Sequence, residues 1–275
     1  MPIYHAIILG IVQGLTEFLP ISSSGHLLLV PWLFEWNDFD DNSVEKAFDV
    51  ALHIGTLIAV VAYFWRDLTV YARDGVRAVL HRREPITPEG RLAWLLILSS
   101  IPAFLVGGLF GDTIDEKLGT IPLIAVSLIV FGLLLGWADQ RSKSVRTVDG
   151  FGRRDALLVG AAQVLALNPG TSRSGITITA GRFLSFTRDS AARISFLMAI
   201  PVTLGAVVFK MAQLIGDGIP DGLVTPMIVG IITSGLAGWL AVWWTIKYVR
   251  THTFTPFVIY RVVLGVLVLV IYAAR

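Results

Sequence analysis

Two stretches interrupt an otherwise apolar chain with ionisable and hydroxyl-bearing residues: 13-QGLTEFLPISSSGH-26 and 168-NPGTSRSGIT-177. They place Glu17, His26 and Arg173 inside sequence that is hydrophobic enough for a membrane interior. A charged side chain at the centre of a bilayer costs roughly 2.5 kcal/mol or more, so such residues are functional candidates by default. The two stretches therefore locate the chemistry, and because each carries helix-breaking residues they also decide the fold.

The rest of the chain has the composition of a membrane protein. Of its 275 residues, 55% are hydrophobic and 15% are charged, and the mean hydropathy is +0.72. A soluble domain of this length would carry far more charge. The absence of cysteine excludes disulfides, thiolate metal sites and a cysteine nucleophile. Six apolar segments each approach the ~20 residues that cross a bilayer as a helix: 47–65, 92–110, 118–137, 194–211, 223–246 and 256–272.

Positive charge in the short connections predicts how these spans are oriented. The connections 66–91 and 141–154 are rich in arginine and lysine, so we expect both on the cytoplasmic side. The opposite connections are acidic or nearly uncharged, as at 38–41, and are expected outside. With six spans threaded in this way, the two polar stretches do not fit as crossings.

Each polar stretch instead separates two short apolar pieces, which predicts two re-entrant hairpins. The first, 3–19 with 26–34, would enter from outside, and the second, 156–167 with 176–184, from the cytoplasm. Backbone that is irregular at membrane depth must be satisfied by protein or by water in a cavity, so the breaks are expected to line a polar pocket.

The two halves of the chain also resemble each other. Gly10-x-x-Gln13 recurs as Gly160-x-x-Gln163, and residues 23–25 are matched by 173–175. In each half a broken hairpin precedes three spans. Opposite sides of insertion make this the pattern of an inverted-topology repeat with its site near the midplane. We therefore predict an all-α polytopic membrane protein of six transmembrane helices and two re-entrant hairpins. It forms one integral membrane domain, 1–275, with halves of about 1–138 and 155–275.

The residue types in the two breaks suit a phosphate ligand. Helices that restart after a break present unpaired N–H groups and positive dipole ends, which bind anions. Arg173 can grip a phosphate in bidentate fashion. Glu17 and His26 can transfer protons, Glu17 could also hold Mg²⁺ or Ca²⁺, and Ser23 could be a nucleophile. Further binding candidates are Gln13, Ser22, Ser24, Gly170, Ser172, Ser174 and Thr177. Asp49 and His53, four residues apart, either border this pocket or form a local pair.

At these residues the chain resembles the undecaprenyl-diphosphate phosphatase family of bacitracin-resistance membrane proteins. The family's first motif, Glu or Gln followed four residues later by Glu, is matched by Gln13 and Glu17, and its Ser and His by Ser23 and His26. Its second motif, Pro-Gly-x-Ser-Arg-Ser-x-x-Thr, is intact at 169–177. Gln13 stands where the family can have Glu, so Glu17 is the only carboxylate of the first motif.

The resemblance implies an enzyme that removes the terminal phosphate of undecaprenyl diphosphate at the outer face of the bacterial inner membrane. This reaction recycles the lipid carrier for cell-wall synthesis and confers bacitracin resistance. A divalent cation, Mg²⁺ or Ca²⁺, is expected to assist, and catalysis is assigned to Glu17, Ser23, His26 and Arg173. Attack by Ser23 and direct attack by water both stay open.

Two other classes of function compete with this one. An inverted repeat with broken helices equally suits a secondary transporter or a flippase for polyprenyl phosphates, whereas a non-catalytic scaffold would leave both polar motifs without a purpose. The expected partners are the lipid substrate and the bilayer, with no nucleic acid. A homodimer is left open.

Overall fold

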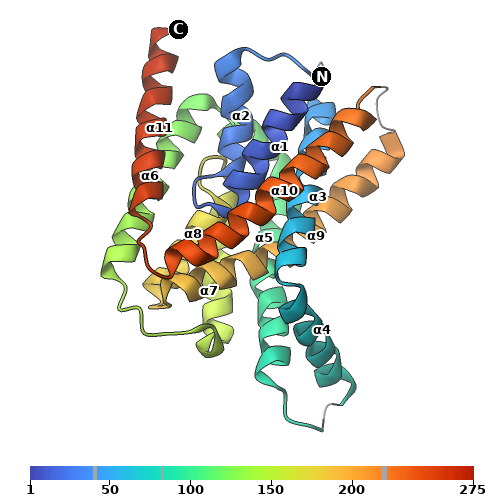
Figure 1. Cartoon of the computed structure of the whole chain (residues 1–275), viewed down its shortest axis with the longest axis vertical. Helices are drawn as coiled ribbons and strands as arrows, with labels where there is room; N and C mark the ends of the chain where they lie inside the picture. The colour runs from blue at the N-terminus through green and yellow to red at the C-terminus, as the bar shows by residue number, and fades with distance from the viewer. Residues whose placement is uncertain (40–41, 82, 218–221) are drawn as a thin grey trace.

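The computed structural model describes residues 1–39, 42–81, 83–217 and 222–275, and over these ranges it contains helices and no strand (Figure 1). The helices are α1 (Ile3–Phe18), α2 (Ser23–Phe34), α3 (Asn42–Tyr63), α4 (Trp65–Leu80), α5 (Pro88–Leu118), α6 (Ile121–Arg141), η1 (Val148–Gly150), α7 (Arg153–Val164), η2 (Leu165–Leu167), α8 (Arg173–Phe183), α9 (Arg188–Asp217), α10 (Val224–Val249) and α11 (Thr255–Ala274).

Among these helices, five are long and apolar enough to cross a membrane: α5, α6, α9, α10 and α11. Helix α3 joins α4 at a bend of 83°, and this bent pair passes the same test together, which makes up to six spans within the described ranges. The expected class, an all-helical polytopic membrane protein, is confirmed at this level. Both termini lie at one end of the long axis, and the connection between α4 and α5 lies at the other (Figure 1).

Several sequence-based boundaries differ from the structure, and two of the differences have a local physical reason. The apolar segment 47–65 runs past the bend at Phe64, after which the expected connection 66–91 begins with helix α4 rather than a loop. Hydropathy continues across Phe64 and Trp65, so it cannot register the change of direction. The segment 118–137 starts too early, because α6 begins at Ile121 with Pro122 in its first turn, a favoured position for proline. Of the stretch 38–41, residues 40 and 41 lie outside the described part.

Both helix breaks have the same backbone construction. Ser22 precedes α2 with φ 80°, and its Oγ accepts from the N–H of Gly25 at 3.3 Å. Ser172 precedes α8 with φ 73°, and its Oγ accepts from the N–H of Gly175 at 3.0 Å. These residues cap each new helix in the same way. As a result, Ser23 and Arg173 both stand at the first position of a short helix.

Each broken pair packs against a helix from the other half of the chain. Helix α1 lies along α10, and α7 lies along α5. Glycine permits both close approaches: a Cβ on Gly10 would overlap the hydroxyl of Thr233, and a Cβ on Gly160 would overlap the carbonyl oxygen of Ser99. The two halves are thus interlocked rather than side by side.

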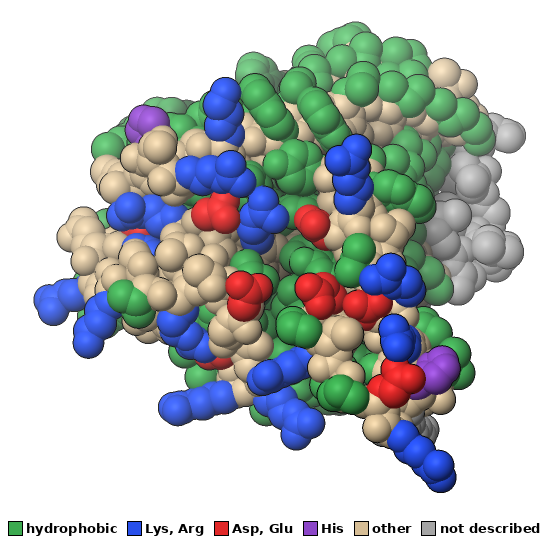
Figure 2. Space-filling model, turned by 60° about the horizontal axis from the view of Figure 1, so that its bottom comes forward, with side chains coloured by type: hydrophobic (Ala, Val, Ile, Leu, Met, Phe, Trp, Pro, Cys, Tyr) green, Lys and Arg blue, Asp and Glu red, His purple; other side chains and the backbone are tan. Residues whose placement is uncertain are grey.

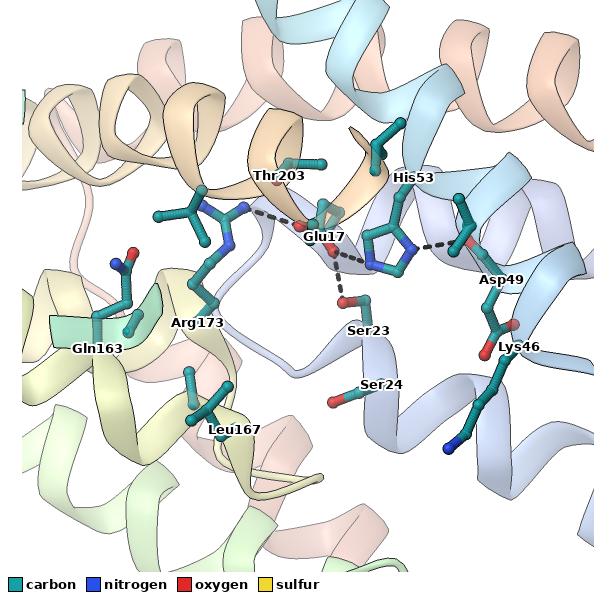
Figure 3. Close-up of a pocket in the computed structure, with 16 residues that line it drawn as sticks. Glu17, Ser23, Ser24, Lys46, Asp49, His53, Gln163, Leu167, Arg173 and Thr203 are labelled. Carbon is teal, nitrogen blue, oxygen red and sulfur yellow. Dashed lines mark hydrogen bonds and ion pairs between the residues drawn. The ribbon is translucent and has the colours of Figure 1, made fainter. Parts of the chain in front are cut away.

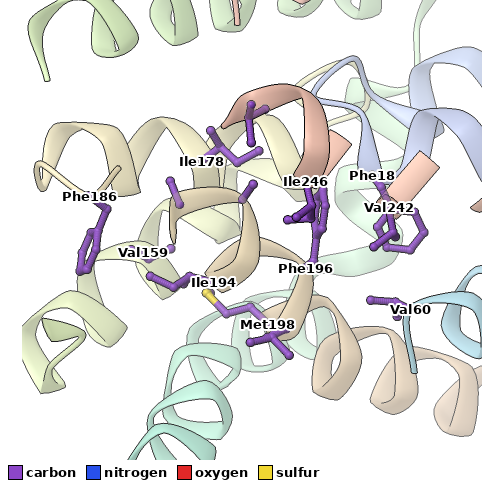
Figure 4. Packing of buried hydrophobic residues seen from close by; sticks show 14 of the residues in the cluster. Phe18, Val60, Val159, Ile178, Phe186, Ile194, Phe196, Met198, Val242 and Ile246 are labelled. Atoms are coloured by element: carbon purple, nitrogen blue, oxygen red, sulfur yellow. The ribbon is translucent and has the colours of Figure 1, made fainter. Parts of the chain in front are cut away.

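A hydrophobic cluster next to the first break holds the end of α1 in place (Figure 4). Phe18, 1% exposed, packs edge-on against Phe196 of α9 with ring centroids 5.4 Å apart. Val242 and Ile246 of α10 belong to the same cluster. Because Phe18 is anchored there, the direction of its neighbour Glu17 is set by packing.

Candidate active site

Glu17, in the last turn of α1, joins the two breaks. Its side chain is only 6% exposed, and its carboxylate accepts hydrogen bonds from residues of both halves. Oε2 accepts from Ser23 Oγ at 2.6 Å, and Oε1 accepts from Arg173 Nη2 at 2.8 Å (Figure 3). Oε2 also accepts from Gln13 Nε2 at 3.0 Å. The structure therefore brings together the carboxylate, the serine and the arginine that the sequence analysis placed in one site.

The contact between Ser23 and Glu17 has the geometry of a nucleophile beside its base. A hydroxyl that donates at 2.6 Å to a carboxylate is a strong, charge-assisted hydrogen bond. A serine becomes a useful nucleophile when an adjacent group can accept its proton. Ser23 and Glu17 can serve in these roles without a change of rotamer.

Arg173 uses only part of its guanidinium in the ion pair with Glu17. Nη2 contacts the carboxylate, whereas Nη1 is buried and has no hydrogen-bond partner among the described residues. An unpaired buried donor on a charged group is costly, and a phosphate oxygen would satisfy it. Arg173 can therefore hold Glu17 and still offer a donor to an anion.

His53 approaches the same carboxylate from α3. Its Nε2 lies 3.9 Å from Glu17 Oε2, and its Nδ1 donates to the backbone carbonyl of Asp49 at 2.7 Å. That hydrogen bond requires a proton on Nδ1 and leaves Nε2 as the ring nitrogen nearer to Glu17. Asp49 and His53 were expected either to border the pocket or to form a local pair. The structure shows both, since the two residues are joined by this hydrogen bond and also line the cavity described next.

These side chains line a cavity of 310 Å³ (Figure 3). One part of its wall is polar and the rest is apolar, as expected for a ligand with a charged head and a hydrocarbon portion. The polar lining consists of Glu17, Ser23, Ser24, Lys46, Asp49, His53, Gln163, Arg173 and Thr203. The apolar lining consists of Val50, Ala103, Ala166, Leu167, Val202, Ala206 and Val207.

His26, expected to be catalytic, is not part of this lining. Its Nδ1 bonds to the carbonyl of Ser22 at 2.6 Å, and its Nε2 bonds to the hydroxyl of Tyr260 at 2.7 Å. Its ring also stacks on that tyrosine of α11. A catalytic role for His26 stays a prediction, and the contacts seen here are those of a residue that holds α2 against α11.

Most of the expected binding residues contact other parts of the protein and do not line the cavity. Ser174 Oγ donates to the carbonyl of Leu19 at 3.0 Å, and Thr177 Oγ1 donates to Ser195 Oγ at 2.7 Å. Gly170 has φ 89°, a conformation that favours glycine. Ser22, Ser172, Ser174, Thr177, Gly170 and Gln13 are buried and are not part of the cavity lining, whereas Ser24 is. Direct binding by the former group stays a prediction.

The residue that the sequence analysis missed most clearly is Arg261 of α11. It is fully buried, and it donates to the carbonyls of Pro20 in the first break at 3.2 Å and of Gly170 and Thr171 in the second, both at 2.9 Å. Further bonds reach the carbonyls of Ser127 and Leu128 in α6. Arg261 therefore fastens both breaks to each other. A single arginine inside an apolar span was a signal that could have identified it.

The residues present offer few ligands for a divalent cation. Among the described residues, no group of three or more His, Cys, Asp or Glu side chains could hold a metal ion. Glu17 does have a neighbouring oxygen to add, because Gln13 Oε1 is buried without a partner in the described part of the chain. This set fits a Mg²⁺ ion that takes one or two protein ligands and completes its shell with phosphate oxygens and water.

Comparison with known proteins places the chain in a family. Residues 6–267 match the family described as "Bacitracin resistance protein BacA". The undecaprenyl-diphosphatase of Pelobacter propionicus is 47% identical over 266 residues, 96% of this chain and 95% of that relative. The undecaprenyl-diphosphatase of Geobacter sulfurreducens is 46% identical over 277 residues, all of both chains, and that of Geotalea daltonii 45% over 271 residues, 98% of each. With a match this long, the chain belongs to the BacA bacitracin-resistance family.

Proposed function

We propose that this protein removes the terminal phosphate of undecaprenyl diphosphate, which gives undecaprenyl phosphate and inorganic phosphate. The observation that carries the proposal is the contact of Ser23 and Arg173 with the two oxygens of one buried carboxylate, Glu17. The names of the relatives supply the substrate class. The product is the lipid carrier that cell-wall synthesis reuses, and its recycling accounts for bacitracin resistance.

In this reaction Glu17 acts as the general base. It takes the proton of Ser23 Oγ while that oxygen attacks the terminal phosphorus, and the bond to the bridging oxygen breaks, which releases undecaprenyl phosphate. Water then hydrolyses the phosphoserine. In the alternative, Glu17 takes the proton of a water that attacks directly, and Ser23 only orients it. Both routes use the same hydrogen-bonding position on Oε2.

Arg173 stabilises the transferring phosphoryl group. Phosphoryl transfer requires little covalent chemistry from the protein, so positioning and fixed positive charge supply most of the rate. The unpaired Nη1 of Arg173 would donate a hydrogen bond to the phosphoryl group. The first turns of α2 and α8 add the partial positive charge of helix N-termini. Ser22, Ser172, Ser174 and Thr177 shape those turns in this scheme, and His26 supports α2.

A divalent cation is part of this proposal: Glu17 would hold it, and Gln13 Oε1 is a second candidate ligand. When bound, Mg²⁺ or Ca²⁺ would neutralise charge on the diphosphate. Gln13 Nε2 would continue to donate to Glu17, which keeps the carboxylate oriented. Addition of a chelator should then lower turnover, and added Mg²⁺ or Ca²⁺ should restore it.

We further infer an inverted-topology repeat of two halves, about 1–138 and 155–275, in a single membrane domain. The matched caps at Ser22 and Ser172 and the reciprocal packing of α1 on α10 and α7 on α5 support it. In this arrangement α3, α5, α6, α9, α10 and α11 are the six spans, and α1–α2 and α7–α8 are the re-entrant hairpins.

We place this protein in the bacterial inner membrane with the active site open to the outer side. Lysine and arginine side chains gather on the face that carries α4 and the connection 141–154 (Figure 2). Positive charge of this kind marks the cytoplasmic side. The termini and the open end of the first hairpin then lie outside. A homodimer stays a prediction.

The decisive test uses purified protein in detergent, where no gradient exists. It should release inorganic phosphate from undecaprenyl diphosphate. A protein that releases none but moves the lipid between leaflets of liposomes would instead be a flippase.

Mass spectrometry after rapid acid quenching of turnover tests the nucleophile. Phosphate on Ser23 is expected in the wild type. Ser24→Ala is the matched control for Ser23→Ala, because Ser24 is the neighbouring cavity-lining hydroxyl and its hydrogen bond is with Ser22 Oγ rather than with Glu17. Turnover by Ser23→Ala at the rate of Ser24→Ala would favour direct attack by water.

A further inference from the structure

Gln163 on α7 is a buried amide that lines the cavity without a partner. It is 2% exposed, and neither its Nε2 nor its Oε1 has a hydrogen bond to any described residue. An unsatisfied buried amide group costs about 1–3 kcal/mol, so native proteins rarely leave one without a partner or a ligand. Gln163 therefore needs a binding role or another explanation.

The matching residue of the first half offers that other explanation. Gln13 has the same place after Gly10 that Gln163 has after Gly160, and its Nε2 donates to Glu17 one turn later. One turn after Gln163 stands Leu167, which cannot accept a hydrogen bond. Gln163 would then be a remnant of the repeat whose carboxylate partner is missing.

The position of Gln163 favours a ligand over a remnant. In Figure 3 Arg173 lies between Glu17 and Gln163, so Gln163 is on the side of the guanidinium opposite to Ser23. Arg173 Nη1 is the other buried group in this part of the cavity that lacks a partner among the described residues. Two residues that line the same cavity thus have donors without a partner among the described residues.

The apolar wall next to Gln163 indicates which part of a substrate would lie there. Ala166 and Leu167, within about one turn of Gln163, line the same cavity. In a prenyl diphosphate the phosphate that is not transferred lies between the terminal phosphate and the hydrocarbon chain. With the terminal phosphate at Ser23 and Arg173, that second phosphate is the group closest to Gln163.

Resting on the proposed function, we propose that Gln163 binds the phosphate that stays on the lipid. Its amide N–H groups donate to an oxygen of this phosphate, and the hydrocarbon chain continues along Ala166 and Leu167. Because the amide is neutral, it can bind this phosphate without the strong charge pairing that would slow release of the lipid phosphate product. The charge that this leaving phosphate gains develops on the bridging oxygen. A contact with one of its non-bridging oxygens should therefore stabilise the substrate and the transition state to a similar extent and act mainly on KM.

The test compares the wild type with Gln163→Met, and with Gln140→Met as the matched control on an exposed position of α6. Hydrolysis of farnesyl diphosphate in detergent is measured together with inhibition by farnesyl phosphate and by inorganic phosphate. We expect Gln163→Met to raise KM and to weaken inhibition by farnesyl phosphate about 10-fold each, the effect of one hydrogen bond to a charged group. Inhibition by inorganic phosphate and kcat should stay within about twofold, and Gln140→Met should match the wild type.

Other outcomes overturn the proposal without ambiguity. If Gln163→Met binds farnesyl phosphate as tightly as the wild type, Gln163 is a remnant. If kcat falls and KM does not, it acts on the chemical step rather than on the retained phosphate. If Gln163→Met does not fold, Gln163→Glu is tested instead. This variant should weaken the binding of farnesyl phosphate by at least the ~10-fold expected for Gln163→Met. Unchanged or tighter binding of farnesyl phosphate contradicts the proposal. A wild type inactive on undecaprenyl and farnesyl diphosphates alike would refute the proposed function instead.

Discussion

The two helix breaks share a backbone but differ in the side chains that they carry. In both, a serine with positive φ caps a new helix through the N–H of a glycine. The first break then presents Ser23 beside Glu17, whereas the second presents Arg173 and has Leu167 at the position that matches Glu17. The two breaks therefore share one backbone conformation, whereas the reactive side chains differ between them.

This difference explains why neither break can form a site alone. The first supplies a carboxylate and a hydroxyl but no cation for a phosphate, and the second supplies the cation but no base. The ion pair of Glu17 with Arg173, at 2.8 Å, is the junction between the two breaks. Variants that remove either partner, or the groups that hold the breaks together, should therefore have effects that rank by how directly they affect this junction.

Removal of either charged partner should have the largest effect. We expect Arg173→Ala and Glu17→Gln each to lower kcat at least ~100-fold, because one loses preorganised positive charge and the other loses the base. Arg153→Ala, at an exposed position of α7, is the control and should keep normal turnover. Near-normal turnover by either site variant, measured as phosphate release, would remove that residue from the mechanism.

The next largest effect should come from Arg261, whose side chain bonds to carbonyls of both breaks. Arg261→Met leaves these buried carbonyls unpaired, and hydrogen bonds to a charged group contribute about 1.5–3 kcal/mol. We expect a lower thermal unfolding midpoint and turnover reduced ~10-fold or more. Arg261→Lys should recover part of both losses. If Arg261→Met loses stability but keeps kcat, Arg261 supports the fold and does not position the site.

Sequence reasoning found the charged residues of the site because their cost in a membrane makes them conspicuous. Glu17 and Arg173 were predicted on that ground, and the structure joins them. Arg261 has the same signal but no surrounding motif, so its partners could be found only from the fold. Gln163 is uncharged, and its missing partners are visible only once its neighbours are placed.

The sequence did not indicate in which direction side chains and helices point. His26 is close to Ser23 along the chain, yet the packing of Tyr260 over that turn decides where its ring points. The bend of 83° at Phe64 likewise depends on packing, since the apolar pattern continues through it. Composition and motifs therefore predict which residues matter more reliably than which face they occupy.

The helix-start glycines provide a matched pair for the same comparison. A Cβ on Gly175 would lie 2.8 Å from Arg261 Nη1, whereas the nearest neighbour of a Cβ on Gly25 is Gly170 Cα at 3.3 Å. Gly175→Ala must displace the arginine that holds both breaks, and over-packing of this kind costs about 1–3 kcal/mol. We expect Gly175→Ala to lower the thermal midpoint and kcat more than Gly25→Ala. The reverse order would show that Arg261 moves easily and that the first break is the tighter one.

The smallest effect should come from the serine caps, and here the two breaks should respond alike. Ser22 and Ser172 accept equivalent N–H groups at 3.3 and 3.0 Å, so Ser22→Ala and Ser172→Ala should each cost about 1 kcal/mol of stability. Glycine at an N-cap costs only a few tenths of a kcal/mol and also tolerates positive φ, so Ser→Gly at either position should be nearly neutral. Thermal unfolding of the four variants measures this. Equal losses of stability in Ser22→Ala and Ser172→Ala would support the view that both breaks are stabilised by the same backbone cap. A loss confined to one serine would mean that the two breaks are stabilised in different ways.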